Sequence, residues 1–335
     1  MTGTLKECLM EAWGKLSQEE QSKITFHDFT QKWLNTVLEK GLPDIKKGYS
    51  EASVKNEQDR DEFAENAFTS WCNSYQDLSC LVEYCTDVGE RCLASETLTP
   101  VEYVLRRGHA RACMLAKETL LLLKNAYPDG AMSRWRTLYE ISTTMAFVSK
   151  HGEECAIKYL DHLEIDTYKA MIARNSCADE LGYDPVPQEV LDEQEALRNE
   201  LIEKYDRPFG NDYGWAAGFI ASKQKPSIKS IAEEAGFGHW FIHYKTSSQS
   251  VHSSHMSFLS PNATGDMGRE ILLAGQSEKE LFNPAQLLAI TFTQLTCKVL
   301  SSRVDFAYSL DLLALNSLMD STVKSLHNEL VTRRN

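Results

Sequence analysis

The sequence predicts an all-α protein, a helical bundle of roughly ten helices around one main core. Glycine (17) and proline (9) are both sparse for 335 residues, which disfavours the turn-rich architectures of all-β proteins. Helix formers dominate most windows, and 42% of the residues are hydrophobic, enough to bury a substantial core. We expect an N-terminal helical extension, residues 1–90, and a helical core domain, residues 91–335, which carries both motifs described below.

The first ninety residues show the spacing of amphipathic helices. The stretches "LKECLMEAW" and "FTQKWLNTVLEKGLPD" place apolar residues three to four apart, and Gly41 with Pro43 predicts a helix end. The following "SEASVKNEQDRDEF" has almost no apolar residue and is typical of a loop or a solvated helix start. A longer helix is expected from "FAENAFTSWCNSYQDLSCLVEYC".

In the core domain the helix boundaries carry clear signals. Thr99 before Pro100 is a good N-cap, and this helix is expected to end near Pro128. The next helix should start after the turn "PDG", with Ser133 as its cap, and "EECAIKYLDHLEIDTYKAMIARNSC" continues as helix. Residues 178–206, broken by two prolines, predict a solvent-facing helical hairpin. After the Gly- and aromatic-rich loop "RPFGNDYGWAAG", apolar helices "NPAQLLAITFTQLTCKVL" and "DLLALNSLMDSTVKSL" end the chain; they suit a dimer interface or an internal core equally.

Charge and cysteine content narrow the class of protein. The net charge of -13 argues against a broad nucleic-acid-coating surface. Residues 100–136 nevertheless hold seven bases against three acids, so a locally basic face can still bind a small anion or an RNA strand. Nine cysteines form no C-x-x-C pair, which indicates reduced thiols in a cytoplasmic protein. We expect no signal peptide and no membrane span.

The stretch "HYKTSSQSVHSSHMSF" is the first candidate site. On a helix, Tyr244, Ser248, His252 and His255 fall within about 80° of one another, and such a set can do acid, base or hydrogen-bond work. A serine-rich helix end whose hydroxyls bond their own backbone is the alternative. The pair in "HWFIH" has the i, i+4 spacing of a zinc helix but lies on the opposite side and lacks the glutamate, so we predict no metal and no cofactor.

The stretch "SRWRTLYEISTTMAF" is the second candidate. Arg136 and Glu140 are one helical turn apart beside a wide apolar stripe, so we expect this pair to be at least partly buried. Because apolar replacements of buried pairs are often as stable, stability alone explains the pair weakly, although a structural ion pair between helices remains an alternative. Arg134 is expected to reach outward from the helix start.

Together, "RWRTLYE" and "HYKTSSQSVHSS" resemble a family of uncharacterised bacterial proteins. That family has an R-(T/S)-(L/I)-x-E helix and a later Y-x-x-x-S-x-x-(V/I)-H segment, and the match runs roughly from residue 60 to 310. The shared positions are Arg136, Glu140, Tyr244, Ser248 and His252. The family's arginine and histidine on facing helices are similar in kind to the arginine and histidine of HEPN proteins. Many HEPN proteins are metal-independent ribonucleases in toxin and antiviral systems. The HEPN spacing R-x(4-6)-H is absent before His252, so Arg136 would have to supply the arginine from another helix.

The resemblance implies a ribonuclease in which His252 is the general base and Arg136 stabilises the phosphate. Glu140 would hold Arg136, while Tyr244 and Ser248 orient the histidine or contact phosphate. Five further residues are expected to bind substrate: Arg106, Arg107, Arg134, Lys245 and His255.

Three other hypotheses are open. The same cluster could form a non-enzymatic sensor or binding module for a small anionic ligand or a partner protein, for example one from the same operon. A second hypothesis is a serine hydrolase that uses Ser248 and His252, although the sequence has no G-x-S-x-G elbow. A third is a polar layer in the helical bundle with a purely structural role. A homo-oligomer is compatible with each of them.

Overall fold

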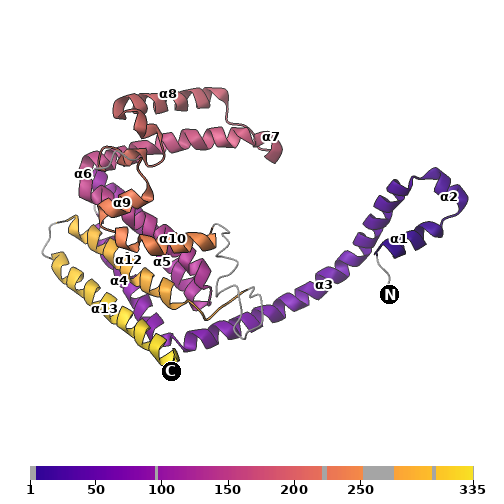
Figure 1. Ribbon diagram of the computed structural model, residues 1–335, viewed down its shortest axis with the longest axis horizontal. Helices are drawn as coiled ribbons and strands as arrows, with labels where there is room; N and C mark the ends of the chain where they lie inside the picture. The colour runs from indigo at the N-terminus through magenta and orange to yellow at the C-terminus, as the bar shows by residue number, and fades with distance from the viewer. Residues whose placement is uncertain (1–4, 95–96, 221–224, 252–274, 304–306, 335) are drawn as a thin grey trace. The chain divides into compact units, whose positions relative to one another are not determined.

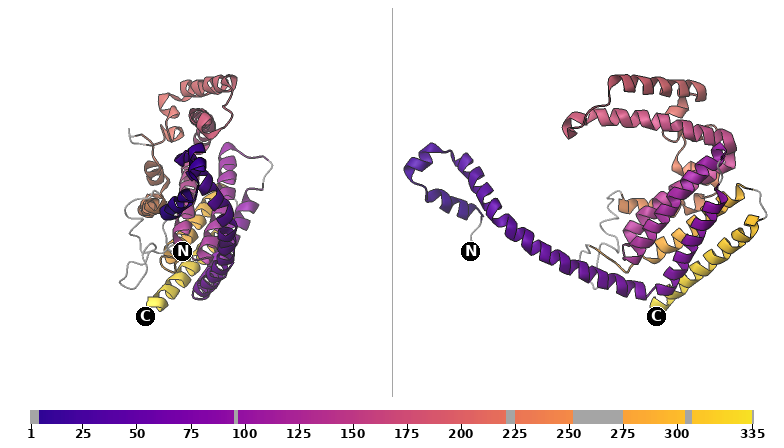
Figure 2. Two further views of the ribbon diagram at one scale, coloured as in Figure 1. Left: turned by 90° about the vertical axis from the view of Figure 1, so that its right-hand side faces the viewer. Right: turned by 180° about the vertical axis from the view of Figure 1, so that it is seen from behind.

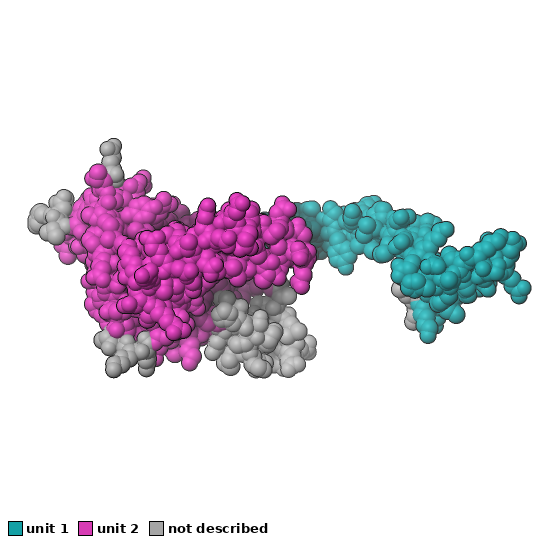
Figure 3. Space-filling model, turned by 90° about the horizontal axis from the view of Figure 1, so that it is seen from above, with its two compact units in different colours: residues 1–63 teal, residues 64–335 magenta. Residues whose placement is uncertain are grey.

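The computed structural model describes residues 5–94, 97–220, 225–251, 275–303 and 307–334. Within these ranges the chain forms α-helices and three short 3-10 helices but no β-strand, which confirms the all-α prediction (Figure 1). The chain divides into two compact units, residues 1–63 and 64–335, coloured separately in Figure 3. In the described part of the chain, no helix combines the length and the apolar character that a membrane crossing requires.

Unit 1 consists of two short helices and most of a long one. These are α1 (Leu5–Gly14), α2 (Gln18–Lys23) and α3 (Phe26–Thr69), the last of which ends in unit 2. Ser17 and Glu20 form a capping box at the start of α2. The Trp13 ring packs edge-on against the Phe26 ring, with the two ring centroids 5.1 Å apart. The expected helix end at Gly41 and Pro43 is wrong, since α3 continues through both. A proline inside a helix removes a single backbone hydrogen bond, and regular helix lies on both sides of it here.

Unit 2 holds the main core. Its five long helices lie side by side in Figures 1 and 2: α4 (Cys72–Cys92), α5 (Pro100–Lys124), the first part of α6 (Pro128–Ser176), α12 (Phe282–Ser301) and α13 (Ala307–Arg334). Helix α12 is central, because it packs against the other four. Its Phe292 and Leu288 are buried, so the apolar stretch near residue 290 serves an internal core. Helix α4 lies in the range expected for the N-terminal extension, yet its apolar face is part of this core.

The start of α5 follows its sequence signal, whereas the start of α6 does not. Thr99 accepts from the Glu102 amide and completes a capping box, as its position before Pro100 predicts. Helix α6 begins at Pro128, five residues before the expected cap Ser133, whose hydroxyl donates to the Asp129 carbonyl inside the helix. A proline at the first helical position needs no backbone N–H, so "PDG" starts the helix instead of forming a turn.

Helix α6 changes direction at Gly152, which has φ 77° and ψ -158°. The residues before this kink lie in the five-helix bundle, and Figure 1 shows the second arm running away from it. Residues 178–206 form α7 (Ala178–Leu181) and α8 (Gln188–Tyr205), and α8 packs back on α6. The chain then returns through η1 (Arg207–Gly210), η2 (Gly214–Ala216), α9 (Ile228–Ala235), η3 (Gly238–Trp240) and α10 (Phe241–Val251). Helices α9 and α10 both contact α6, which places the second sequence motif against the first.

Candidate functional site

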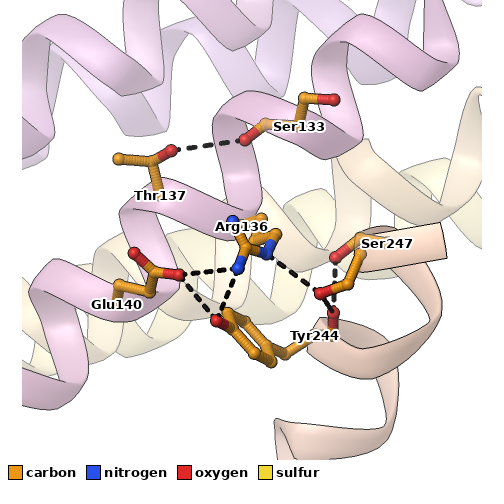
Figure 4. A network of polar contacts seen from close by, with 7 residues as sticks. Ser133, Arg136, Thr137, Glu140, Tyr244 and Ser247 are labelled. Atoms are coloured by element: carbon orange, nitrogen blue, oxygen red, sulfur yellow. Dashed lines mark hydrogen bonds and ion pairs between the residues drawn. The ribbon is translucent and has the colours of Figure 1, made fainter. Parts of the chain in front are cut away.

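The site is built where α10 crosses the first arm of α6. Arg136 and Glu140 are one turn apart on α6, and Tyr244 and Ser248 are one turn apart on α10. Figure 4 shows the α6 pair and the Tyr244 ring pointing toward one another. Four of the five residues shared with the resembled family therefore meet in one polar network, hereafter the α6–α10 network.

The hydrogen bonds of the α6–α10 network converge on the Arg136 guanidinium. Its Nε donates to Ser248 Oγ at 3.0 Å and its Nη2 donates to the Tyr244 hydroxyl at 2.7 Å. The same Nη2 lies 3.2 Å from Glu140 Oε1, which also accepts a hydrogen bond from the Tyr244 hydroxyl at 2.7 Å. Ser248 in turn donates to the Tyr244 carbonyl at 2.9 Å. Arg136 is thus fixed in position by one acid and two hydroxyls.

Apolar packing around Tyr244 explains why this contact is ordered. Tyr244 is buried, with its ring centroid 5.3 Å from that of Tyr139 and 5.4 Å from that of Phe241. The Arg136 Cζ lies over the same ring, 4.6 Å from its centroid. Tyr139 is itself fixed, because its hydroxyl donates to the Phe237 carbonyl at 3.0 Å. The α10 tyrosine is therefore held by stacking as well as by its hydroxyl.

Burial sets the electrostatics of the network. The side chains of Arg136 and Glu140 are 21% and 33% exposed, which confirms that the pair is partly buried. Burial, and next the hydrogen bond to Glu140, raise the pKa of Tyr244 far above its ordinary value. The Tyr244 hydroxyl is consequently a proton donor to Glu140 at neutral pH, and Glu140 balances the charge of Arg136.

Of the three histidines in the stretch "HYKTSSQSVHSSHMSF", the structure describes His243. His252 and His255 lie outside the described residues, and α10 is described as far as Val251. His243 lies near Trp135, with ring centroids 6.5 Å apart, and burial lowers its pKa. No group of three or more potential metal ligands occurs in the part of the chain that the structure describes.

The basic candidates are spread over several places. Arg106 lines a hollow beside His109, whereas its neighbour Arg107 lines a different one. Arg134 pairs with Glu118 at 3.5 Å and is 42% exposed, so it reaches outward as expected. Lys245 is an exposed residue that follows Tyr244 on α10. The structure does not gather these cations into one strip.

A pocket beside the α6–α10 network was missed by the sequence analysis. It has a volume of about 390 Å³ and lies against α5, both arms of α6, the η2 turn and α9. Glu140 belongs to both the pocket and the network. The i, i+4 spacing of Arg107 and Arg111, which both line it, is the one signal that could have pointed to it from the sequence.

Fold and site together define an all-α protein whose two motif helices are joined through an arginine, a glutamate, a tyrosine and a serine. Residues 102–267 match the model of a family of unknown function (DUF5677). The resemblance to an uncharacterised family is thereby confirmed over a shorter range than residues 60–310, and the matched range contains both motifs. No curated protein and no solved structure matches the chain.

Proposed function

We propose that the chain is a metal-independent ribonuclease of HEPN-like type, acting in the cytoplasm as a toxin or antiviral effector. The observation that carries the proposal is the 3.0 Å contact between Arg136 Nε and Ser248 Oγ. Ser248 precedes His252 by four residues, so the arginine of the first motif is joined to the second motif close in sequence to the proposed base. Because no arginine lies four to six residues before His252, a HEPN-like site would need an arginine from another helix. The contact between Arg136 and Ser248 supports that arrangement.

In the proposed reaction His252 removes the proton from a ribose 2′-hydroxyl. The 2′-oxygen attacks phosphorus, the bond from phosphorus to the 5′-oxygen breaks, and the leaving oxygen takes a proton from water. Arg136 stabilises the charge on the phosphoryl oxygens, and Glu140 and Tyr244 keep its guanidinium in place. The products are a 2′,3′-cyclic phosphate and a 5′-hydroxyl end. Lys245 and Arg134, both exposed and next to the network in sequence, would contact neighbouring phosphates.

The test is cleavage of transfer RNA in EDTA by the wild type, H252A and R136K. His239→Ala is the matched control, because His239 is an exposed histidine at the preceding 3-10 turn. We expect wild type and H239A to produce 5′-hydroxyl ends, and H252A and R136K to lose at least a hundredfold in rate while circular dichroism shows that both variants are folded at the assay temperature. Absence of cleavage by folded wild-type protein, or full activity of H252A, would contradict the nuclease proposal.

A second candidate function is a non-enzymatic module that binds a small anion at Arg136. It is favoured by the guanidinium geometry: Nε and Nη2 have partners, whereas Nη1 has none among the described residues. One edge of a prepositioned guanidinium is then free for an anion. Inorganic phosphate should raise the thermal midpoint of the wild type but not of R136K. An equal rise in both proteins would exclude Arg136 as the anchor.

A further inference from the structure

The pocket between α5 and α6 has the size of a small-molecule site. Its volume of about 390 Å³ falls within the usual range of ligand pockets. The kink at Gly152 brings Tyr159 and Leu160 of the second α6 arm to the same hollow as Ile141 of the first arm. Residues of α5, the first residue of α9 and Tyr213, just before η2, complete the lining. Five parts of the fold therefore shape one concave surface.

Two of the residues that line this pocket carry a positive charge with no carboxylate partner in the described part of the chain. Arg107 and Arg111 are one turn apart on α5 and both are exposed. The Arg107 guanidinium lies over the Tyr103 ring at 5.2 Å, and Arg111 donates to the Met114 sulfur at 3.4 Å. Neither arginine has a carboxylate partner among the described residues, whereas Lys117 on the same helix pairs with a glutamate. The pocket therefore offers two guanidinium groups to an anion.

The residue just before the η2 turn also lines the pocket. Tyr213, which lines the pocket, has φ 56°, a left-handed conformation that is uncommon for a large side chain. The next residue must be glycine, because a Cβ on Gly214 would lie 2.3 Å from the Phe209 carbonyl oxygen. Burial, and next the charge of Glu140, raise the pKa of Tyr213, so its hydroxyl is protonated at neutral pH. Tyr213 thus adds a hydrogen-bond donor to the residues that line the pocket.

Apolar side chains also line the pocket. Val104, Ile141 and Leu160 contribute to the lining, with Met145 beside them. Gly108 allows α5 to approach α6 here, since a Cβ would lie 2.3 Å from the Met145 sulfur. Glu140 adds a carboxylate whose charge Arg136 already balances. A mainly apolar lining with a few charged and polar groups is usual for a site that binds an amphipathic molecule.

We propose that this pocket binds a small amphipathic anion, a phosphate or carboxylate group on a compact aromatic or apolar body. Arg107 and Arg111 bind the anionic group, and the body lies against Val104, Ile141 and Leu160. The site does not depend on ribonuclease activity and does not use Arg136 as its anchor. It lies next to the α6–α10 network, with which it shares Glu140.

The test is isothermal titration calorimetry, in which the full chain is titrated with each of four probes. Phenyl phosphate and benzoate carry both features, inorganic phosphate carries the anion alone, and benzyl alcohol carries the ring alone. The variant is the double substitution R107Q/R111Q, whose exposed side chains make a folding defect improbable to begin with and easy to check by circular dichroism. The matched control is K117Q, which removes one positive charge from the same helix away from the pocket.

We expect saturable binding of phenyl phosphate, benzoate or both, and the tighter of the two identifies the anionic group. R107Q/R111Q should weaken it at least tenfold, and K117Q should leave it within twofold. Inorganic phosphate and benzyl alcohol should each bind at least tenfold more weakly. Absence of saturable binding of both amphipathic probes at millimolar concentration, equal affinity of the double variant, or equal affinity for inorganic phosphate would overturn the proposal.

Discussion

Replacing Tyr244 by phenylalanine tests whether the α6–α10 network stabilises the fold. The change removes a hydroxyl that donates to Glu140 at 2.7 Å and accepts from Arg136 at 2.7 Å, and it keeps the ring packed against Tyr139 and Phe241. Hydrogen bonds to charged groups contribute about 1.5–3 kcal/mol each when buried. Because Arg136 and Glu140 are partly exposed and remain paired at 3.2 Å, we expect a loss of about 1–2 kcal/mol in the free energy of unfolding.

Urea denaturation followed by circular dichroism measures this loss as a lower midpoint at unchanged slope. Tyr183→Phe is the matched control, because that side chain is 56% exposed and its hydroxyl has no hydrogen bond within the described structure. Glu140→Gln should cost more than Y244F, since it leaves the partly buried Arg136 charge without its acid. A Y244F protein as stable as the wild type would refute the idea that this hydroxyl joins the two helices.

Three further outcomes are expected. Gly89→Ala should destabilise the protein by about 1–3 kcal/mol, because the new Cβ would lie 2.1 Å from the His109 ring. Gly48→Ala has open space around it and should stabilise its helix by up to about 1 kcal/mol. Equal midpoints of the two variants in thermal denaturation would contradict this. Burial lowers the pKa of His109 to about 4. The unfolded chain then binds a proton that the folded chain does not, so stability should fall by up to about 3 kcal/mol as the pH drops from 6.5 to 4, and His109→Gln should flatten that limb of a stability–pH profile. Burial raises the pKa of Tyr139 to about 12, and the pKa of Tyr244 is raised as well. Stability should therefore be intact below pH 10 and decline above it, and an absorbance titration at 295 nm that finds every tyrosine ionising together near pH 10 would disprove this.

Helix content and the local geometry of the motifs could be predicted from the sequence, because both depend on neighbours within one turn. Thr99 with Pro100 predicts the start of α5, and the four-residue spacing of Arg136 and Glu140 predicts their ion pair. Tyr244 and Ser248 share one helix face for the same reason. The two wrong boundaries, at Pro43 and Pro128, both concern proline, whose effect depends on where the helix begins.

Other features depend on contacts between residues far apart in the chain, which no local pattern encodes. Arg136 meets Ser248 because α10 packs on α6, and that packing follows from buried side chains such as Tyr139 and Tyr244. The pocket exists because α6 changes direction at Gly152, where φ is positive. The glycine alone does not reveal in which direction the second arm continues. The sequence by itself therefore determined the helices and the faces on which their polar residues lie. Only the tertiary structure decided which faces meet, since helix packing is set by the shape of the whole core.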